Sequence, residues 1–445
     1  MTYKISMVSL GCSKNLIDSE QMIGVLKGKD YEVTEDHSEA DIIVVNTCGF
    51  IDKAKEESID TILEAAEQKV HGKCKCLIVA GCLSERYREE LLDEIPEVDG
   101  VLGTGNIVEI AEIVEKSLAG ERVSKFGDVD ADYFEDSKRV ISTPSHSAYI
   151  KISEGCDNLC TYCIIPKLRG KYRSRKIESI LDEARELAES GTKELILIAQ
   201  DTSKYGMDLY GEYRLPELLD ELQKLEGIEW IRILYIYPET FTDELVDAIA
   251  RNSKVAKYVD IPIQHINDRV LKLMNRKTDK SSITALVEKL RSKVEGIVIR
   301  TTLIVGFPGE GEDEFRELKD YVEEMKFDRL GVFAYSQEED TPAAKMKDQV
   351  DEEVKEQRQL EVMKVQKDIS EEKSRSNIGR KFRVLVEEKV EDGVYLGRTY
   401  MDSPEIDGLL YVHSDRELEI GEFQTVIVKD ALEYDLIGDV ADELS

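Results

Sequence analysis

Residues 148–163 read Ala-Tyr-Ile-Lys-Ile-Ser-Glu-Gly-Cys-Asp-Asn-Leu-Cys-Thr-Tyr-Cys, a short apolar strand followed by three closely spaced cysteines. Cys156, Cys160 and Cys163 have the spacing C-x3-C-x2-C in the loop after the strand. A [4Fe–4S] cluster normally takes four cysteines. With three, one iron keeps an open coordination position, where a small molecule can bind and react. A zinc ribbon would need a fourth ligand and usually two C-x2-C pairs, so the loop favours a reactive iron–sulfur cluster.

Three further cysteines, Cys12, Cys48 and Cys82, lie upstream at about equal spacing, each within three residues of a short β-rich run. The expected strands are 5–10, 42–46 and 77–80, with helices at 19–27 and 53–69 between them. This order predicts a parallel sheet whose strand ends share one edge, where the three thiolates would hold an auxiliary [4Fe–4S] cluster. Three separate buried thiols are the alternative. Cys74 and Cys76 lie at the opposite end of the third strand and are expected to be core or surface thiols.

The bulk composition describes an ordinary soluble globular chain. Its 445 residues suggest about three domains of roughly 150 residues each. Eight cysteines are far fewer than the roughly 8–10% of residues found in disulfide scaffolds, which favours a reducing compartment. The N-terminus lacks the apolar segment of a signal peptide, and no run reaches the ~18 apolar residues of a membrane helix. We therefore expect a cytoplasmic protein without membrane contact.

The net charge of −33 and the pI near 4.7 bear on the kind of partner. Nucleic-acid binders usually present a basic domain, because phosphate contacts need Lys and Arg, so direct nucleic-acid binding is not expected. An acidic surface instead attracts a basic partner, with solubility alone as the alternative explanation. Residues 380–445 are especially acidic, with seven Lys and Arg against seventeen Asp and Glu.

The order of elements divides this α/β chain into four parts. We expect an N-terminal parallel α/β domain over 1–120, a linker over 121–145, a partial (βα)6 barrel over 146–374 and a small antiparallel β-barrel over 377–443. The expected strands of the partial barrel are 148–153, 194–199, 230–236, 258–261, 298–305 and 330–335. Strands at 381–387, 394–400, 408–412 and 424–429 should form the last part, after a charged connecting helix at 351–374. The three clustered cysteines then lie at the C-terminal mouth of the partial barrel, where barrel enzymes place their sites.

Other polar residues are candidates for the same mouth. Gln200, Gln264 and Arg300 fall at or within expected strand ends and are candidates for binding a cofactor. Six cations lie within residues 167–176; they either hold a carboxylate of the cofactor or substrate, or are simply solvated. His265 has no Cys or Asp at ligand spacing and is expected to be structural. The Gly-rich segment that follows the fifth strand lacks the Gly-Lys-Ser/Thr of a phosphate loop and should shape a turn.

The C-x3-C-x2-C loop at the mouth of a β–α barrel resembles that of the radical S-adenosylmethionine (SAM) superfamily. In that superfamily the open iron binds SAM, and an electron from the cluster cleaves the sulfonium to a 5′-deoxyadenosyl radical. The resemblance implies that Cys156, Cys160 and Cys163 hold this cluster. One departure is that the Gly-Gly-Glu often found after the second strand is replaced by Ala-Gln-Asp-Thr at 199–202, which leaves the contacts to the cofactor amine open.

Over nearly its whole length the chain resembles the methylthiotransferases, which combine an N-terminal three-cysteine domain, a radical SAM core and a C-terminal TRAM barrel. Four strings are similar to those of the members that modify a ribosomal-protein aspartate: Ser-Leu-Gly-Cys-Ser-Lys-Asn (9–15), Asn-Thr-Cys-Gly-Phe-Ile (46–51), Ser-Glu-Gly-Cys-Asp-Asn (153–158) and Asp-Ser-Pro-Glu-Ile-Asp-Gly (402–408). The similar tRNA enzymes tend to carry Tyr-Gly-Cys-Gln-Met-Asn at the first of these strings.

The resemblance implies a substrate and a different step of the reaction for each of the two clusters. The radical would take a hydrogen from the β-carbon of an aspartate in the twelfth small-subunit ribosomal protein, a basic protein that is either free or on the small subunit. The auxiliary cluster of Cys12, Cys48 and Cys82 would deliver sulfur, methylated by a second SAM, and an electron donor is needed. The alternative within the enzyme class is tRNA adenosine methylthiolation, which the acidic barrel disfavours. Outside that class the alternative is a non-catalytic iron–sulfur electron carrier, which two open irons disfavour.

Overall fold

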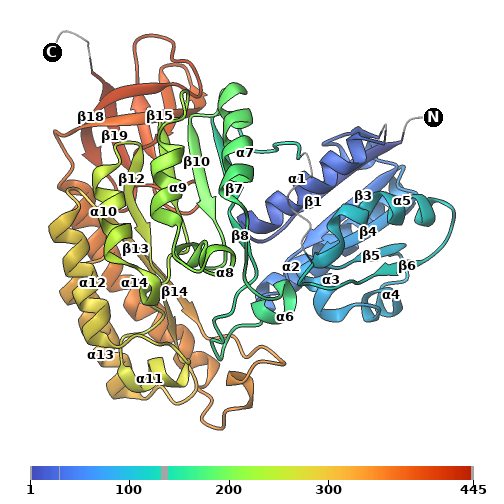
Figure 1. The fold of residues 1–445 in the computed structure, drawn as a ribbon, viewed down its shortest axis with the longest axis horizontal. Coiled ribbons are helices and arrows are strands. Elements are labelled where there is room, and N and C mark those ends of the chain that lie inside the picture. Colours follow the sequence, from blue (N-terminus) through green and yellow to red (C-terminus); the bar gives the residue numbers. More distant parts are fainter. Residues whose placement is uncertain (1–2, 30, 132–138, 442–445) are drawn as a thin grey trace.

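Two parallel α/β sheets and a small β-barrel make up the structure, a computed structural model that describes residues 3–29, 31–131 and 139–441 (Figure 1). The N-terminal sheet and its helices stand beside the larger second sheet, and the small barrel lies at one end of that second sheet (Figure 1). Among the described residues, no helix is both long enough and apolar enough to cross a lipid bilayer.

The N-terminal sheet is parallel throughout, in the order β2-β1-β3-β4-β5-β6, as predicted for a parallel α/β domain. Its strands are β1 (Lys4–Ser9), β2 (Glu32–Val33), β3 (Ile42–Thr47), β4 (Cys76–Gly81), β5 (Gly100–Leu102) and β6 (Val123–Lys125). Strands β3 and β4 are buried along their whole length because helices pack on both faces of the sheet. The helices are α1 (Ser13–Lys27), α2 (Asp52–His71), α3 (Cys82–Tyr87), α4 (Glu90–Glu94) and α5 (Ile110–Leu118).

This sheet extends beyond the boundary expected at residue 120. Strand β6 pairs in parallel with β5, so residues that the sequence pattern places in the linker are part of the N-terminal sheet. A three-residue strand of Val-Ser-Lys is too short to show an alternating pattern, which is why the sequence does not reveal it. Residues 132–138 of the expected linker lie outside the described residues.

The second sheet is an open, parallel six-stranded sheet in the order β14-β13-β12-β11-β10-β7, which confirms the predicted partial barrel. Its strands are β7 (Ser147–Lys151), β10 (Glu194–Ile198), β11 (Trp230–Ile233), β12 (Val255–Asp260), β13 (Val298–Val305) and β14 (Arg329–Ala334). One face packs on a layer of helices: α7 (Ile177–Glu189), α9 (Leu215–Leu222), α10 (Asp243–Arg251), α12 (Lys280–Lys293) and α13 (Glu312–Met325).

Helix α14 (Glu352–Arg375) is more than the connector expected from its charged sequence. It packs against β14 and α13, with Val362 and Ile369 buried. Polar side chains on the same face have specific partners: Arg358 Nη1 lies 2.8 Å from Glu310 Oε1, and Gln366 Nε2 donates to a backbone carbonyl at 3.1 Å. The helix therefore completes the helical layer. Its core-facing side carries several paired polar residues, so the sequence shows no clear apolar stripe.

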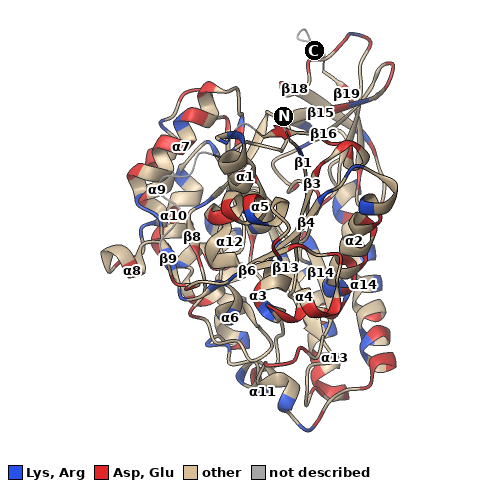
Figure 2. Cartoon of the chain, turned by 90° about the vertical axis from the view of Figure 1, so that its right-hand side faces the viewer, with Lys and Arg blue, Asp and Glu red and all other residues tan. Residues whose placement is uncertain are grey.

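Acidic side chains are spread over the outer helices. Figure 2 shows Asp and Glu along α13 and α14 and on α4 of the N-terminal domain. Lysines join some neighbouring helices, as in the exposed pairs Lys289–Asp243 (2.6 Å) and Lys293–Asp247 (2.7 Å). The excess of negative charge is thus carried largely at the surface, where it influences the approach of charged partners.

The C-terminal barrel closes through five strands in the order β15-β16-β17-β19-β18. They are β15 (Lys381–Glu391), β16 (Val394–Arg398), β17 (Leu410–His413), β18 (Phe423–Ala431) and β19 (Leu436–Val440). The pairing of β17 with β19 is parallel, so the barrel is not purely antiparallel as expected. The sequence pattern does not reveal strand β19 because Gly438 interrupts its apolar run. A Cβ at Gly438 would lie 2.6 Å from the Ile427 carbonyl oxygen, so the close approach of the two strands requires glycine.

A buried ion-pair group fixes the barrel to the second sheet. Glu194 at the start of β10 lies 2.8 Å from Arg232 Nε and 2.6 Å from Nη2 of Arg398 of the barrel. Beside it, the rings of Trp230 and Phe423 meet edge to face with centroids 4.7 Å apart. The barrel is therefore held rigidly against the strands that carry the candidate site.

Candidate active site

The three N-terminal cysteines, named the N-terminal triplet here, lie at one edge of the first sheet. Cys12 precedes α1, Cys48 follows β3, and Cys82 begins α3 directly after β4. Glycines bring their loops together: a Cβ at Gly11 would lie 2.8 Å from Cys48 Cβ, and a Cβ at Gly49 would lie 2.9 Å from the Cys82 carbonyl carbon. The parallel strands thus bring the three cysteine loops to one edge of the sheet.

Burial and positive charge define the environment of Cys82, whereas Cys48 is half-buried and Cys12 is exposed. Burial raises the pKa of the Cys82 thiol to about 12, against the lowering effect of Arg169. A metal must therefore displace the proton for Cys82 to act as a thiolate ligand. Cys74 and Cys76 are both buried, and Cys76 begins β4 at the opposite end of the strand from Cys82; of the two alternatives, core or surface, both are core thiols.

Arg169 reaches the N-terminal triplet from the core. Its Nε and Nη2 atoms lie 3.4 and 3.3 Å from Cys82 Sγ, within hydrogen-bond distance of a sulfur acceptor. Its Nη1 lies 2.5 Å from Asp18, which is also 2.7 Å from Lys151 Nζ. Lys151 in turn lies 2.7 Å from Glu154, two residues before the core cysteines. This buried network connects the N-terminal triplet to the loop of the core cysteines.

Cys156, Cys160 and Cys163, named the core triplet, lie between the short strand β8 (Ser153–Glu154) and α6 (Ile165–Arg169). Burial raises the pKa of the Cys156 thiol to about 12. Two donors face Cys160: its Sγ lies 3.7 Å from the Tyr237 hydroxyl and 3.9 Å from Nη1 of Arg276. Cys156 and Cys160 are therefore buried and Cys163 is half-buried, with two polar groups beside the Cys160 sulfur.

Helix α6 links the two triplets. It begins two residues after Cys163 and ends at Arg169. Ile164 and Leu168 pack against Cys82 in one small apolar cluster. The two sets of cysteines are therefore neighbours across a five-residue helix, a relationship that their sequence separation conceals.

The other predicted cofactor residues have internal partners. Gln200 donates its Nε2 to Glu154 in the network described above. Gln264 has a φ of 69° and bridges to Leu303 on β13 through its backbone. Arg300 lies 2.8 Å from Asp260 and 3.6 Å from Asp407 of the barrel, so its charge is already neutralised within the protein.

The three arginines of residues 167–176 are buried or half-buried and paired with carboxylates of the chain, whereas Lys167, Lys171 and Lys176 are exposed. Arg169 pairs with Asp18, Arg173 lies 3.3 Å from Asp130, and Arg175 lies 2.5 Å from Glu183. Both interpretations offered by the sequence are thus wrong for these arginines, because their acidic partners come from distant segments.

His265 is structural, as expected. The ring is buried; its Nδ1 accepts from the Asn267 backbone N–H at 3.0 Å, and its Nε2 faces Glu310 at 3.3 Å. Glu310 also accepts from the backbone N–H of Gly306 at 2.9 Å, which closes the Gly-rich turn after β13. This turn therefore serves the packing of the barrel mouth.

A cavity of about 440 Å³ opens beside Cys12, where all three parts of the chain meet. Its lining comes from the N-terminal domain (Ser9, Gly11, Cys12, Ser13, Leu16), the core (Tyr149, Leu234, Tyr235) and the loop between β16 and β17 (Glu405, Ile406). Cys12 and the string at 402–408 are both distinctive in the sequence, but their sequence separation conceals that they share one cavity. The cavity offers room for part of a substrate next to the N-terminal triplet.

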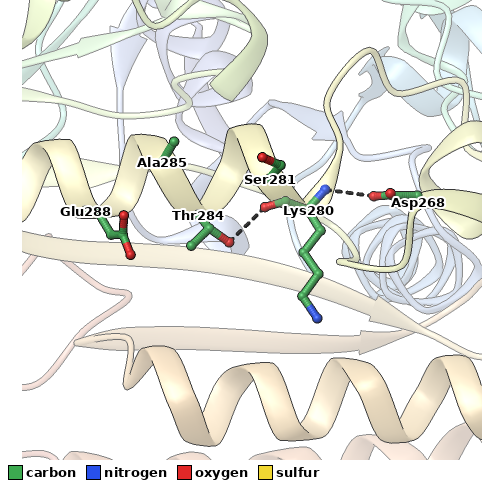
Figure 3. A pocket seen from close by; sticks show the side chains of 6 residues that line it. All are labelled: Asp268, Lys280, Ser281, Thr284, Ala285 and Glu288. Atoms are coloured by element: carbon green, nitrogen blue, oxygen red, sulfur yellow. Dashed lines mark hydrogen bonds between the residues drawn. The ribbon is translucent and has the colours of Figure 1, made fainter.

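Two other features of the described residues lack the chemistry of a site. A hollow of about 520 Å³ lies on the outside of the partial barrel between α11 (Asp268–Leu273) and α12 (Figure 3). Asp268 accepts from the Lys280 backbone N–H at 2.8 Å, and Thr284 donates to the Lys280 carbonyl at 2.8 Å. None of the six lining residues is buried, so the hollow offers no desolvated polar group for a ligand.

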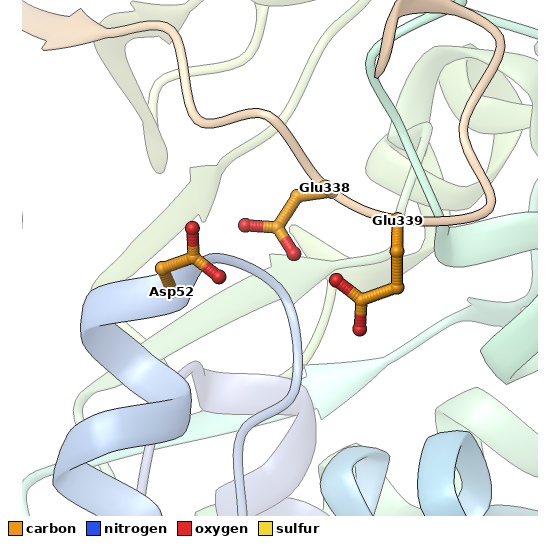
Figure 4. Close-up of side chains that lie close together, drawn as sticks. All are labelled: Asp52, Glu338 and Glu339. Carbon is orange, nitrogen blue, oxygen red and sulfur yellow. The ribbon is translucent and has the colours of Figure 1, made fainter. Parts of the chain in front are cut away.

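Asp52, Glu338 and Glu339 gather between α2 and the loop after β14 (Figure 4). Lys55 Nζ lies 2.6 Å from Asp52 and 2.9 Å from Glu338, while Arg86 Nη1 lies 2.8 Å from Glu338. These cations neutralise the acidic group, which joins the N-terminal domain to the core and fixes the relative position of the two triplets.

Three family models match the chain in order. They are the uncharacterized protein family UPF0004 over residues 4–103, the radical SAM superfamily over 150–322 and the TRAM domain over 378–441. A radical SAM methyltransferase, TsrM, from Kitasatospora setae shares the fold over 74% of this chain and 73% of its own, with a TM-score of 0.56 and 14% identity. The fold and the cysteine loop define a radical SAM enzyme.

Relatives of similar length identify the family within this class to which the chain belongs. The ribosomal protein uS12 methylthiotransferase RimO of Clostridioides difficile (strain 630) is 55% identical over 99% of this chain and 100% of its own. The protein of the same name from Lachnoclostridium phytofermentans is 55% identical over 98% and 99%. The chain belongs to the family of ribosomal protein uS12 methylthiotransferases. The predicted enzyme class and its cofactors, [4Fe–4S] clusters and SAM, are confirmed, and neither the tRNA enzyme nor the electron carrier is favoured.

Proposed function

We propose that this enzyme transfers a methylthio group to the β-carbon of an aspartate in ribosomal protein uS12. The core triplet holds the SAM-binding [4Fe–4S] cluster, and the N-terminal triplet holds the auxiliary cluster. When bound, these clusters and SAM supply the radical that removes the hydrogen and the sulfur and methyl groups that replace it. The observation that carries the proposal is the cavity beside Cys12, which lies between the N-terminal domain, the core and the terminal barrel.

Each triplet suits a cluster with one open iron. Each site has three cysteines on short loops, of which only Cys12 is exposed, and polar groups lie beside the Cys82 and Cys160 sulfurs. Arg169 beside Cys82 and Arg276 beside Cys160 provide positive charge that stabilises thiolate ligands once the protons have left. Burial of Cys156 and Cys160 limits the access of water to the core triplet, which would protect a radical from side reactions.

The acidic terminal barrel suits a basic protein substrate. Its loop places Glu405 at the wall of the cavity, so a cationic segment is attracted to the site and an RNA backbone is repelled. We also propose that the N-terminal domain, the core and the barrel act as the three units predicted from the sequence, that the reaction takes place in the cytoplasm, and that a separate electron donor reduces the core cluster.

Mass spectrometry of parallel reactions tests this function. Anaerobically reconstituted enzyme receives SAM and a reductant together with either purified uS12 or total tRNA. We expect uS12 alone to gain the mass of one methylthio group, located on an aspartate by fragmentation. A gain on tRNA alone would contradict the proposal and assign the enzyme to nucleic-acid modification.

A further inference from the structure

Lys14 is a buried lysine behind the lining of the cavity beside Cys12. It lies in the first turn of α1, next to Ser13, which lines the cavity. The residue is 7% exposed, and its ammonium lies 3.1 Å from the ring centroid of Tyr235, another cavity residue. The charged end of Lys14 is therefore held against the ring of Tyr235, and that ring lines the cavity.

Lys14 differs from the other buried lysines of the described chain because its ammonium has no carboxylate partner. Lys55, Lys151 and Lys355 each have a carboxylate oxygen within 2.9 Å of Nζ. For Lys14, no carboxylate of the described residues lies within the 4.0 Å that defines an ion pair. An ammonium that is removed from water without a counter-charge is costly, and a cation–π contact compensates only in part. The site is thus poised to receive an anion.

Ser13 supplies a second, independent sign of a ligand. Its Oγ is buried and has no hydrogen-bond partner among the described residues, although it lines the cavity. Buried hydroxyls are normally hydrogen-bonded, so this donor points to a partner that is not part of the chain. The N-terminus of α1 adds its positive end at the same place, since Cys12 as N-cap makes no side-chain bond to the first turn.

We propose that Lys14 binds the side-chain carboxylate of the substrate aspartate in this cavity, with Ser13 Oγ as a second donor. The inference rests on the proposed function and deepens it by naming the residues that recognise the target side chain. A carboxylate paired with Lys14 would place the adjacent β-carbon beside Cys12 of the N-terminal triplet, where sulfur is to be delivered. Lys14 is then a specificity-determining residue for an acidic side chain.

The test compares the binding of two substrates by holoenzyme without SAM, so that no turnover occurs. Wild-type enzyme is titrated with uS12 and with uS12 in which the target aspartate is replaced by asparagine. We expect the aspartate form to bind roughly 10- to 100-fold more tightly, as for a charge-assisted hydrogen bond. Equal affinity of the wild-type enzyme for both forms would overturn the inference without the use of any enzyme variant.

Enzyme variants then assign the preference to one side chain. Lys14→Met should bind both substrates equally, with the affinity that wild-type enzyme has for the asparagine form, whereas Lys14→Arg should retain most of the preference. Lys27→Met, at the exposed C-terminal end of the same helix, should behave like the wild type. Iron content and circular dichroism establish that each variant is folded and loaded.

The outcomes separate this inference from the proposed function. If Lys14→Met keeps the full preference, or loses affinity equally for both substrates, Lys14 is only a support for Tyr235 and the inference is wrong, although the enzyme modifies uS12. If wild-type enzyme neither binds nor modifies uS12, the proposed function fails and the inference fails with it.

Discussion

Arg169 Nη2 lies 3.3 Å from Cys82 Sγ, so a side chain from the core reaches the third cysteine of the N-terminal domain. The same arginine pairs with Asp18 and belongs to the helix that begins just after the core triplet. The two triplets are therefore connected by a buried contact between the N-terminal domain and the core.

Removal of this arginine should change the electronic properties of the auxiliary site. In Arg169→Gln the sulfur loses charged hydrogen-bond donors, which stabilise the reduced, more negative cluster. We expect the reduction potential of the auxiliary cluster to fall by on the order of 60 mV, the equivalent of about 1.4 kcal/mol for one electron. Redox titration followed by electron paramagnetic resonance measures this shift. Arg173→Gln, which removes a pair with Asp130 away from the cysteines, should leave the potential unchanged.

Gly11 is predicted to be essential for cluster binding at the N-terminal triplet but not at the core triplet. Its φ is +84°, and a Cβ would lie 2.8 Å from Cys48 Cβ. Gly11→Ala should therefore push apart two of the three ligand loops, and iron per chain should fall to about half, as one of two clusters is lost. Gly120→Ala is the matched control, because its φ is +88° but nothing lies within 4 Å of the added carbon. Full iron content in Gly11→Ala would contradict the assigned arrangement.

Glu405 should contribute to the affinity for a basic substrate. It is exposed on the loop of the terminal barrel that lines the cavity. Charge reversal in Glu405→Lys should weaken uS12 binding by roughly 10-fold at low ionic strength and by less at high ionic strength, because salt screens the interaction. Glu417→Lys reverses an exposed charge elsewhere on the barrel and should have a smaller effect in the same titration. Equal effects of the two variants would show that only net charge matters.

The fold is largely predictable from local pattern, whereas the site depends on contacts between domains. Buried parallel strands such as Ile42–Thr47 are apolar along their length, and short apolar runs identify them. The sequence pattern does not reveal strands β6 and β19, because β6 has only three residues and β19 contains Gly438. The cysteine spacings predict both triplets. The cavity and the pairing of Arg169 with Cys82 are contacts between residues far apart in sequence, which neither periodicity nor spacing encodes.

Glu194 should make the anchoring of the terminal barrel dependent on pH. Burial would raise the pKa of Glu194, but Arg398 and Arg232 outweigh it and lower the pKa from 4.5 to about 2. The carboxylate therefore stabilises the folded protein above about pH 4.5, and this contribution is lost as the pH falls towards 2. Glu194→Gln should unfold more easily than wild type by roughly 3 kcal/mol at neutral pH, and the difference should shrink in acid.

Urea unfolding at a series of pH values measures this difference. Glu189→Gln, an exposed substitution at the end of α7, should match the wild type at every pH. A gap between wild type and Glu194→Gln that stays constant down to acidic pH would show that Glu194 does not titrate as its arginine partners imply.

The central claim is that the two cysteine triplets perform different steps at one cavity. Parallel assays of 5′-deoxyadenosine formation and of methylthio-uS12, with Cys156→Ala and Cys82→Ala as the variants, test it most directly. Cys156→Ala should lose SAM cleavage and product together, whereas Cys82→Ala should still cleave SAM but form no methylthio product. If Cys82→Ala yields full product, or if Cys156→Ala still cleaves SAM, the division of labour between the two triplets is wrong.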